Sequence, residues 1–541
     1  MRQQLLLFII LLVLFLPGLG RKDFYSRGEP REALVAQSML RSGNFVLGTG
    51  YSETIPSKPP LLHWIISTFS WPLGRVTEFS ARLPSALASI ILVFIFYRFL
   101  LSRVDASHAF TAAIVLATSA EWFRSSGTAR VDLLLSALLA GALLTFFAWV
   151  EKPSSKQLIL LTGLLALATL TKGPVALILP GASMFMFLVL SKVRWFRAIR
   201  VPLAVCLVAL LVSAIWYLAA YLLQGEVFWN KFYYENIARF TSSMHDEPHN
   251  HSIPYLFGTL VVGFMPWSLF IIFGLLNKSR WKIGACIKDI PTSLWRYSLI
   301  IIVSFLLFYS IPASKRSVYL LPIYPFISIY FSAYLHRLFQ SRYYVIGVRF
   351  FALFLAVLFG IFSIALISQV EISDYYWKLP QILPRRIELL IASVTIFGAA
   401  AFCLFRFSNR ASLVMLVLLL TLLNSTFLPI FANQRSAKNF SESAARLIEP
   451  NSVIYSYGNE FYAVSFYLNR QIYSAQLSTN LAASNFLLVY EDKLDEICQA
   501  AGSKNLQCEV LLTSDNWVEK PGQTLVLARL GEFDSKQQVA T

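Results

Sequence analysis

The sequence predicts a polytopic α-helical membrane protein with a small external α/β domain at its carboxyl end. The 541 residues are 57% hydrophobic, 15% aromatic and only 14% charged, and the mean hydropathy is +0.61. Soluble domains carry about 25% charged residues, so this composition excludes an ordinary soluble protein. About thirteen apolar runs approach the length needed to cross a hydrocarbon core of roughly 30 Å. The runs cover residues 4–20, 83–101, 108–119, 133–150, 158–171, 174–191, 201–223, 255–276, 298–312, 318–336, 348–368, 387–405 and 411–428.

The first apolar run could be a transmembrane helix or a cleavable signal peptide, because Met1 to Gly20 combines a basic start with an apolar stretch. No A-x-A-like cleavage site follows it, so we expect the helix to be retained. A retained helix also makes the number of spans odd, which fits the distribution of charge.

The formal net charge of +17 follows from membrane topology rather than from nucleic-acid binding. Cations gather in four connections between spans, namely Lys192, Arg194, Arg197 and Arg200, then Lys278, Arg280, Lys282 and Lys288, then Arg337 and Arg342, and then Arg406 and Arg410. With an odd number of spans these connections share one side, which the positive-inside rule assigns to the cytoplasm. The sequence therefore predicts a membrane protein with membrane lipids and no nucleic acid as partners, and with its other connections and its tail on the external side.

Hydrophobicity falls after Leu428, so we divide the chain into a transmembrane domain over residues 1–430 and an external α/β domain over residues 431–541. Short apolar runs and helical patterns alternate in the external domain. The expected strands are "SVIYSY", "FLLVYE", "CEVLLTS" and "TLVLARL", and the expected helices are "NEFYAVSFYLN" and "EDKLDEICQAAG".

The external loop over residues 21–80 is predicted to hold two helices that lie in the membrane interface. The first, "GEPREALVAQSMLRSGN", places Pro30 in its first turn and Gly43 at its end, and its pattern is amphipathic. The second, "LLHWIISTFSWPLG", is rich in aromatic residues. Between them Lys58 precedes two prolines, which favour an extended backbone and hold the lysine in a stiff loop.

Several ionisable and polar residues are predicted to meet at the external lipid boundary. They are Glu29, Arg31 and Glu32 in the first interfacial helix, Lys58, Arg130 and Asp132 at the start of a span, Lys172 in "TKGP", the histidines His245, His249 and His251, and Lys315, Arg316 and Tyr319 in "SKRSVYLLP". Cations with a few carboxylates suit a ligand whose anionic head lies at the membrane surface and whose tail stays in lipid, such as a sugar joined through phosphate to a polyprenol. The cations would stabilise a phosphate leaving group, and Glu29 or Asp132 would be the general base for an acceptor hydroxyl.

Each of these residues also has a structural explanation. Lys58 could extend its amine to lipid headgroups, Glu29 could stabilise a helix N-terminus, and Arg31 could pair with a lipid phosphate. Three histidines within seven residues suit a divalent metal and equally suit an exposed polar loop. The sequence indicates no cofactor other than this candidate metal.

Of the five cysteines, Cys206, Cys286 and Cys403 lie in spans or on the predicted cytoplasmic side, whereas Cys498 and Cys508 lie in the external domain. A helix-to-strand reversal between Cys498 and Cys508 can bring their α-carbons within disulfide distance, and an external compartment would oxidise them. The alternative is two buried thiols.

Seven stretches in order resemble the bacterial aminoarabinose transferase and protein O-mannosyltransferase superfamily, GT-C membrane glycosyltransferases that use polyprenyl-phosphate sugars. They are "GEPREALVAQSMLRSGN", "KPPLLHW", "ARVDLLLSALL", "TKGPVALILPG", "WYLAAYLLQGEVFWNKFYYENIARF", "HSIPYLFGTLVVGFMPW" and "SKRSVYLLPIYP". The resemblance runs over nearly the whole chain. It also implies about thirteen spans, interfacial helices in the first external loop and an external C-terminal domain.

The resemblance implies roles for single residues. The family's acidic pair falls on Gly28 and Glu29 here, so the base would be Glu29 or Asp132. The family's Glu-Lys-Pro becomes Ser57, Lys58 and Pro59, which replaces a glutamate that assists metal binding in aminoarabinose transferases. His251 is the histidine that best matches the family pattern and is the candidate metal ligand. The residues expected at the donor phosphate are Arg31, Lys58, Lys172, Lys315, Arg316 and Tyr319.

The sequence therefore predicts a glycosyltransferase that moves a sugar from a polyprenyl-phosphate donor to lipid A, to another glycan or to a protein. A lipid or polysaccharide transporter and a non-enzymatic membrane scaffold are the alternatives. Proton-coupled and many ion-coupled transporters need ionisable groups within the membrane. No predicted span carries such a group near its middle, which disfavours a transporter.

Overall fold

The structure, a computed structural model, describes residues 2–56, 58–238, 251–270, 290–312, 314–338, 342–368, 386–406, 408–475, 485–503, 506–520 and 522–532. The chain folds into two compact units. Unit 1 comprises Met1–Leu19, Ser57–Leu62 and Arg82–Thr426, and unit 2 comprises Gly20–Pro56, His63–Ala81 and Phe427–Thr541.

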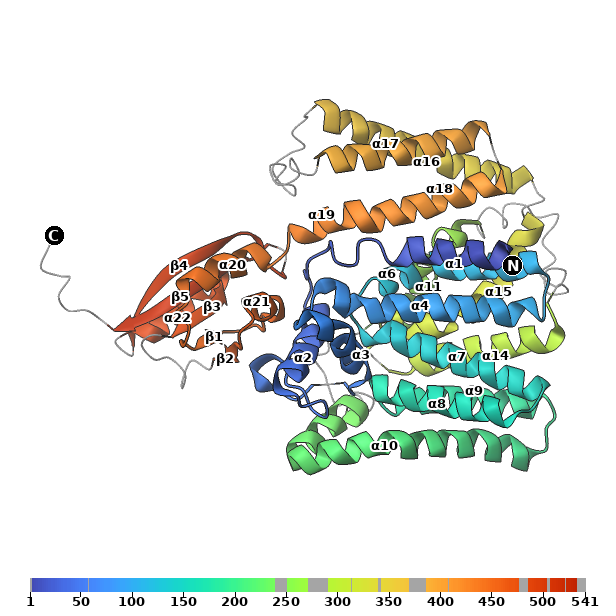
Figure 1. The fold of residues 1–541 in the computed structure, drawn as a ribbon, viewed down its shortest axis with the longest axis horizontal. Helices are drawn as coiled ribbons and strands as arrows, with labels where there is room; N and C mark the ends of the chain where they lie inside the picture. Colours follow the sequence, from blue (N-terminus) through green and yellow to red (C-terminus); the bar gives the residue numbers. More distant parts are fainter. Residues whose placement is uncertain are drawn as a thin grey trace, which may run out of the picture. The chain divides into compact units, whose positions relative to one another are not determined.

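Unit 1 is a bundle of helices (Figure 1). Its elements are α1 (Arg2–Phe15), α4 (Glu78–Leu101, which begins in unit 2), α5 (Ala106–Thr118), α6 (Ala120–Ser126), α7 (Val131–Glu151), α8 (Ser155–Lys172), α9 (Val175–Leu190), α10 (Trp195–Tyr233), the π-helix η3 (Tyr234–Ala238), α11 (Ile253–Gly263), α14 (Thr292–Ser310), the 3-10 helix η5 (Ser317–Ile323), α15 (Tyr324–Leu338), α16 (Arg342–Ser368), α17 (Arg386–Phe405), α18 (Asn409–Leu422) and the π-helix η8 (Leu423–Phe427). Helices that follow one another pack together, as α7 does with α8 and α16 with α17.

The expected helical membrane fold is confirmed. Within the described residues, eight helices are long and apolar enough to cross a membrane, and α1, α5, α9 and α11 are apolar but shorter. Each expected span coincides at least in part with a helix. The expected span over residues 255–276 continues past residue 270, where the described segment ends. The total number of spans therefore stays a prediction.

Helix α1 is packed into unit 1. Its side chains Leu7, Leu11 and Leu14 are buried, and α1 contacts α18 and α5. Just after it, the carbonyl of Leu19 accepts a hydrogen bond of 2.7 Å from the guanidinium of Arg82, which is fully buried. The retention of this helix in the mature protein stays a prediction.

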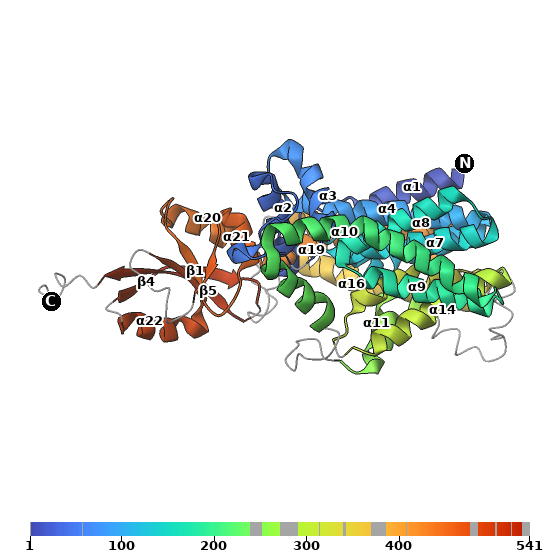
Figure 2. The same cartoon turned by 90° about the horizontal axis from the view of Figure 1, so that it is seen from below.

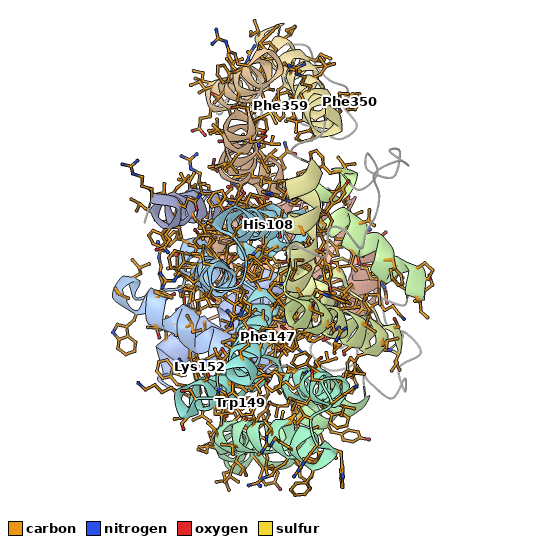
Figure 3. The ribbon with its side chains drawn as sticks, turned by 90° about the vertical axis from the view of Figure 1, so that its right-hand side faces the viewer. His108, Phe147, Trp149, Lys152, Phe350 and Phe359 are labelled. Carbon is orange, nitrogen blue, oxygen red and sulfur yellow. A yellow bond between two sulfur atoms is a disulfide. The ribbon has the colours of Figure 1, made fainter. Side chains whose placement is uncertain are left out.

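An aromatic cluster fills part of the core of unit 1. The ring of Tyr297 lies 5.0 Å from that of Phe147 and 4.7 Å from that of Phe187, measured between centroids. Figure 3 looks along the helices and shows Phe147 among them. The buried Tyr297 hydroxyl donates to the carbonyl of Leu143 at 2.7 Å, so this polar group is satisfied inside the bundle.

Unit 2 contains a five-stranded mixed sheet in the order β2-β1-β3-β5-β4. Strand β1 is parallel to β2 and β3, and β5 is antiparallel to β3 and β4. Its carboxyl-terminal elements are α19 (Leu428–Asn433), α20 (Lys438–Leu447), β1 (Ile454–Ser456), α21 (Tyr462–Leu468), β2 (Tyr473–Ser474), β3 (Phe486–Tyr490), η9 (Glu491–Lys493), α22 (Leu494–Gly502), β4 (Leu506–Trp517) and β5 (Thr524–Glu532). Figure 2 shows α20 and α22 on opposite sides of this sheet. The four expected strands and two expected helices are present, whereas the sequence did not predict β2 and α20.

The first external loop folds together with this sheet domain in unit 2. Its elements are α2 (Gly28–Ser42), η1 (Tyr51–Glu53), α3 (Leu61–Ser70, which begins in unit 1) and η2 (Trp71–Leu73). The buried Tyr51 hydroxyl donates to the Ser456 hydroxyl at 2.7 Å. The Tyr467 hydroxyl accepts from the backbone of Phe24 at 2.8 Å and donates to the Glu78 carboxylate at 2.9 Å. The two helices of the loop are thus confirmed, and their place in a membrane interface stays a prediction.

The predicted disulfide between Cys498 and Cys508 is confirmed. The bond joins α22 to β4, with the α-carbons 5.4 Å apart. Among the described residues, Cys206 and Cys403 are free thiols, and Cys286 lies outside them.

Candidate active site

The turn "TKGP" connects α8 to α9 and sets the direction of Lys172. Gly173 has φ 102°, a backbone angle that glycine adopts without strain. Its N–H donates to the carbonyl of Thr169 and closes α8, and Pro174 then begins the next helix. Lys172 is consequently the last residue of α8, with its side chain directed at the start of α7.

Asp132 lies in the first turn of α7 and is surrounded by cations. Lys172 donates to its Oδ1 at 2.7 Å, and the Nε of Arg130 lies 3.6 Å from its Oδ2. The positive charge of Arg316 acts on the same carboxylate. The Asp132 side chain is 9% exposed and that of Lys172 is 19% exposed. The positive end of the α7 helix dipole also favours a carboxylate at this position. That effect alone does not explain why cations surround Asp132.

Residues 315–319 contribute further side chains around Asp132 and Lys172. The ring centroid of Tyr319 lies 4.7 Å from the Lys172 amine, and its ring stacks on Tyr309 at 5.1 Å. The Nε of Arg316 is buried and has no hydrogen-bond partner within the described residues. The buried Lys315 amine donates to the carbonyl of Pro312 at 2.6 Å. The structure therefore brings together five of the residues expected at the external lipid boundary, and we call Arg130, Asp132, Lys172, Arg316 and Tyr319 the Asp132 cluster.

Lys58 has a partner that the sequence did not predict. Its amine donates to the Glu235 carboxylate at 2.9 Å, and the two side chains are 16% and 8% exposed. The next residue, Asn236, packs against Gly173, where an added Cβ would lie 2.4 Å from the Asn236 Oδ1. Helix η3 thus lies against the turn that carries Lys172 and presents an acid to Lys58.

Glu29 and Arg31 lie in α2, which belongs to unit 2. Glu29 is buried in the first turn of the helix. Arg31 donates twice to one oxygen of Glu32, at 2.7 and 3.1 Å, and the other Glu32 oxygen lies 2.8 Å from the Nε2 of the fully buried His63. Burial alone would raise the pKa of Glu32, but the Arg31 guanidinium and the His63 imidazole hold that pKa well below its usual range. The orientation of Arg31 is therefore fixed by an ionised carboxylate.

The metal hypothesis stays a prediction. His251 stacks on the ring of Tyr255 with centroids 3.9 Å apart, and His245 and His249 lie outside the described residues. In the described part of the chain, no group of three or more histidine, cysteine, aspartate or glutamate side chains is arranged to hold a metal ion.

Sequence reasoning identified the cations of the site together with Asp132 and Glu32, and it missed Glu235, the partner of Lys58. Glu235 is an acid within the aromatic-rich run "FYYENIARF", and that contrast could have marked it. Nothing local in the sequence marks the pairing of Glu32 with His63, which lie 31 residues apart.

Comparison with known proteins gives matches over most of the chain. The family model described as dolichyl-phosphate-mannose-protein mannosyltransferase matches residues 57–217. The undecaprenyl phosphate-alpha-4-amino-4-deoxy-L-arabinose arabinosyl transferase of Shewanella sediminis is 25% identical over 502 residues, which is 90% of this chain and 87% of the relative. An uncharacterized protein of Aquifex aeolicus is 25% identical over 483 residues, 87% of this chain and 88% of the relative.

The solved structures give the same fold. The crystal structure of ArnT from Cupriavidus metallidurans bound to undecaprenyl phosphate has a TM-score of 0.72 and 18% sequence identity, and the match covers 97% of both chains. Its apo structure matches with the same values. At this identity the match establishes the fold. Together with the family model and the curated relatives, it confirms the superfamily resemblance seen in the sequence.

Proposed function

We propose that this chain, which shares the sequence resemblance and the fold of that superfamily, is a membrane glycosyltransferase that uses a polyprenyl-phosphate sugar as donor. The observation that carries the proposal is the Asp132 cluster. Several cations converge there on one carboxylate, at the ends of long apolar helices. Such a site can bind the anionic head of a lipid whose tail remains in the membrane.

The reaction needs one bond to form and one to break. The acceptor hydroxyl oxygen bonds to the anomeric carbon of the sugar, and the bond between that carbon and the phosphate oxygen breaks. The hydroxyl proton passes to a carboxylate, and polyprenyl phosphate leaves with the electron pair. Phosphate is a good leaving group when cations stabilise its charge, so no general acid is required.

The residues divide into two roles in this proposal. Lys58, Lys172 and Arg316 stabilise the phosphate, with Tyr319 against the Lys172 amine. The base is Asp132 or Glu29. Asp132 already accepts a hydrogen bond from Lys172, so it also holds that lysine in place. Arg31 and Lys315 remain proposed contacts to the donor.

The comparisons support an enzyme over a transporter. The relatives with a printed activity are transferases, and the matching family model is that of a mannosyltransferase. Since the Shewanella protein is named for undecaprenyl phosphate-linked aminoarabinose, a polyprenyl phosphate donor is the proposed substrate here. The sugar is left open, because Ser57 replaces the glutamate of the family's Glu-Lys-Pro.

The side of the membrane is also part of the proposal. The distribution of basic residues favours a periplasmic position for the Lys58 loop, for the Asp132 cluster and for the domain over residues 431–541, with residues 1–430 as the membrane domain. The acceptor would then be lipid A, another periplasmic glycan or an exported protein.

The decisive experiment incubates the purified protein in nanodiscs with polyprenyl-phosphate donors that carry different labelled sugars, together with lipid, glycan and protein extracts. An enzyme releases polyprenyl phosphate and transfers label to one extract, which identifies the acceptor class. A transporter leaves the donor intact. Release of no polyprenyl phosphate from any donor, with intact donor moved across a vesicle membrane, would overturn the proposal.

A further inference from the structure

Glu235 accepts a hydrogen bond from the Lys58 amine at 2.9 Å, and its position is unusual for a carboxylate. It lies in η3, a π-helical turn that directly follows α10. Helix α10 is broken before it at Gly225, where φ is 53° and ψ is −128°. Single π-helical turns often occur at functional sites because they redirect side chains. Here the redirected side chain is an acid that contacts a predicted phosphate-binding lysine.

The contact is a partly buried ion pair with a restricted cation. Lys58 precedes Pro59 and Pro60, which limit the backbone conformations of the loop. Its amine donates to Glu235 Oε2 at 2.9 Å, and both side chains are largely covered. A charge-assisted hydrogen bond of this kind is stronger than a neutral one. In the free protein the Lys58 amine is therefore already paired with the Glu235 carboxylate.

Two anions cannot use this amine without repelling each other. A phosphate oxygen that takes a hydrogen bond from Lys58 would lie next to the Glu235 carboxylate, in a setting with little water to screen the charges. The donor is a phosphodiester with one negative charge, whereas the product, a phosphate monoester, approaches two charges at neutral pH. The repulsion is consequently greatest for the product.

We infer that Glu235 is a displaceable counterion of Lys58, which leaves the amine when the lipid phosphate binds and returns to it as polyprenyl phosphate departs. This inference rests on the proposed function and deepens it, because it assigns a residue that limits product retention. Asn236 holds η3 in place during this exchange, so that only the Glu235 side chain moves. Its amide donates to the carbonyl of Phe232 at 2.9 Å, and its side chain packs against Gly173, so η3 stays beside Lys172 while the Glu235 carboxylate changes partner.

A double-mutant cycle on polyprenyl phosphate binding tests the inference. The full-length protein in nanodiscs is titrated with undecaprenyl phosphate, and binding is followed by tryptophan fluorescence. Glu235→Gln is expected to tighten binding about threefold to tenfold, the effect of removing a partly exposed competing charge. Lys58→Ala is expected to weaken binding, and Glu235→Gln is expected to have a smaller effect in the Lys58→Ala background, because the two anions then no longer compete for the amine and only their repulsion remains.

Two matched variants control for general effects. Glu226→Gln removes an exposed acid from α10, the helix directly before η3, and should bind like the wild type. Glu235→Ala should tighten binding in the same direction as Glu235→Gln, so a folding defect in one variant does not decide the result. Product release by Glu235→Gln in a stopped-flow chase should be slower by the same factor.

The outcomes separate this inference from the proposed function. If the wild type binds undecaprenyl phosphate and Lys58→Ala weakens it, but both Glu235 variants bind as the wild type or more weakly, then Glu235 positions Lys58 and the exchange model is wrong. If the wild type does not bind undecaprenyl phosphate at all, the proposed function fails together with the inference.

Discussion

Asp132→Asn is the substitution for which the structure makes the most specific prediction. The change keeps the shape of the side chain and removes its charge, so Lys172 at 2.7 Å and Arg130 at 3.6 Å lose their counterion. Removing one partner of a fully buried ion pair typically costs about 3 to 5 kcal/mol. Lys172 retains 19% exposure and a ring contact with Tyr319, so we expect a loss of about 2 kcal/mol in the free energy of unfolding.

A double-mutant cycle isolates this energy. Asp132→Asn, Lys172→Gln and the double variant are unfolded reversibly in mixed micelles with denaturant. The double variant should regain part of the loss, because the Lys172 amine is then no longer left without its counterion while Arg130 still is, with a coupling energy of about 1 to 2 kcal/mol. Strictly additive losses would refute the reasoning that these two side chains form one electrostatic unit.

The same variants assign the general base when Glu29→Gln is included. The true base should lose about 100-fold or more in turnover with little change in donor affinity, because a base acts in the transition state. The other carboxylate should change binding or stability instead. Intact turnover in both variants would contradict general-base catalysis by either residue.

Three further predictions concern unit 2. Burial raises the pKa of Glu519 from 4.5 to about 7. The folded state therefore holds its proton more tightly than the unfolded state, and stability should fall as pH rises from about 4.5 to about 7, by on the order of 3 kcal/mol. In the full-length protein, Glu519→Gln should abolish this dependence in the amide exchange of β4 and β5, and an unchanged pH profile would contradict it. Cys498→Ser with Cys508→Ser should destabilise the same strands by about 2 to 3 kcal/mol for the separation of 10 residues. Thiol labelling of the denatured, unreduced wild type should find three reactive cysteines, and five would exclude the disulfide. Tyr51→Phe removes the buried hydrogen bond to Ser456 and should cost about 1 kcal/mol in protection from exchange; unchanged protection would show that this bond does not stabilise unit 2.

Hydropathy predicted the positions of the helices well but not the number that cross a membrane. The apolar runs are a property of local sequence, and each contains a helix. Helices such as α5 and α11 are shorter than a span requires, and their depth depends on packing against neighbouring helices rather than on their own composition.

The external domain shows a similar limit. Short apolar runs predicted β1, β3, β4 and β5. Strand β2 has two residues and α20 is polar, so neither carries a clear signal. The joining of the first loop to the sheet through Tyr51 and Ser456 spans 405 residues, and no local pattern encodes such a contact.

In the candidate site too, the local sequence identified some residues, and only the folded chain identified their partners. Lys58 was recognised from the two prolines that follow it, Lys172 from its place in "TKGP", and Asp132 because an acid beside an apolar span is expensive to keep. Their pairing depends on the packing of α8 and η3. Glu235 lies 177 residues from Lys58, so only the folded chain identifies it as the partner.

The most direct test of the central claim, that a lipid-linked phosphate binds at Lys58 during glycosyl transfer, compares kcat/KM for the donor in Lys58→Ala and Lys152→Ala. Lys152, labelled in Figure 3, is an exposed lysine directly after the last residue of α7, whereas Asp132 lies in the first turn of that helix. Loss of a charge-assisted phosphate contact costs about 1.5 to 3 kcal/mol, so Lys58→Ala should lose about 10-fold to 100-fold in kcat/KM while Lys152→Ala matches the wild type. Wild-type donor kinetics in a well-folded Lys58→Ala protein would contradict the account.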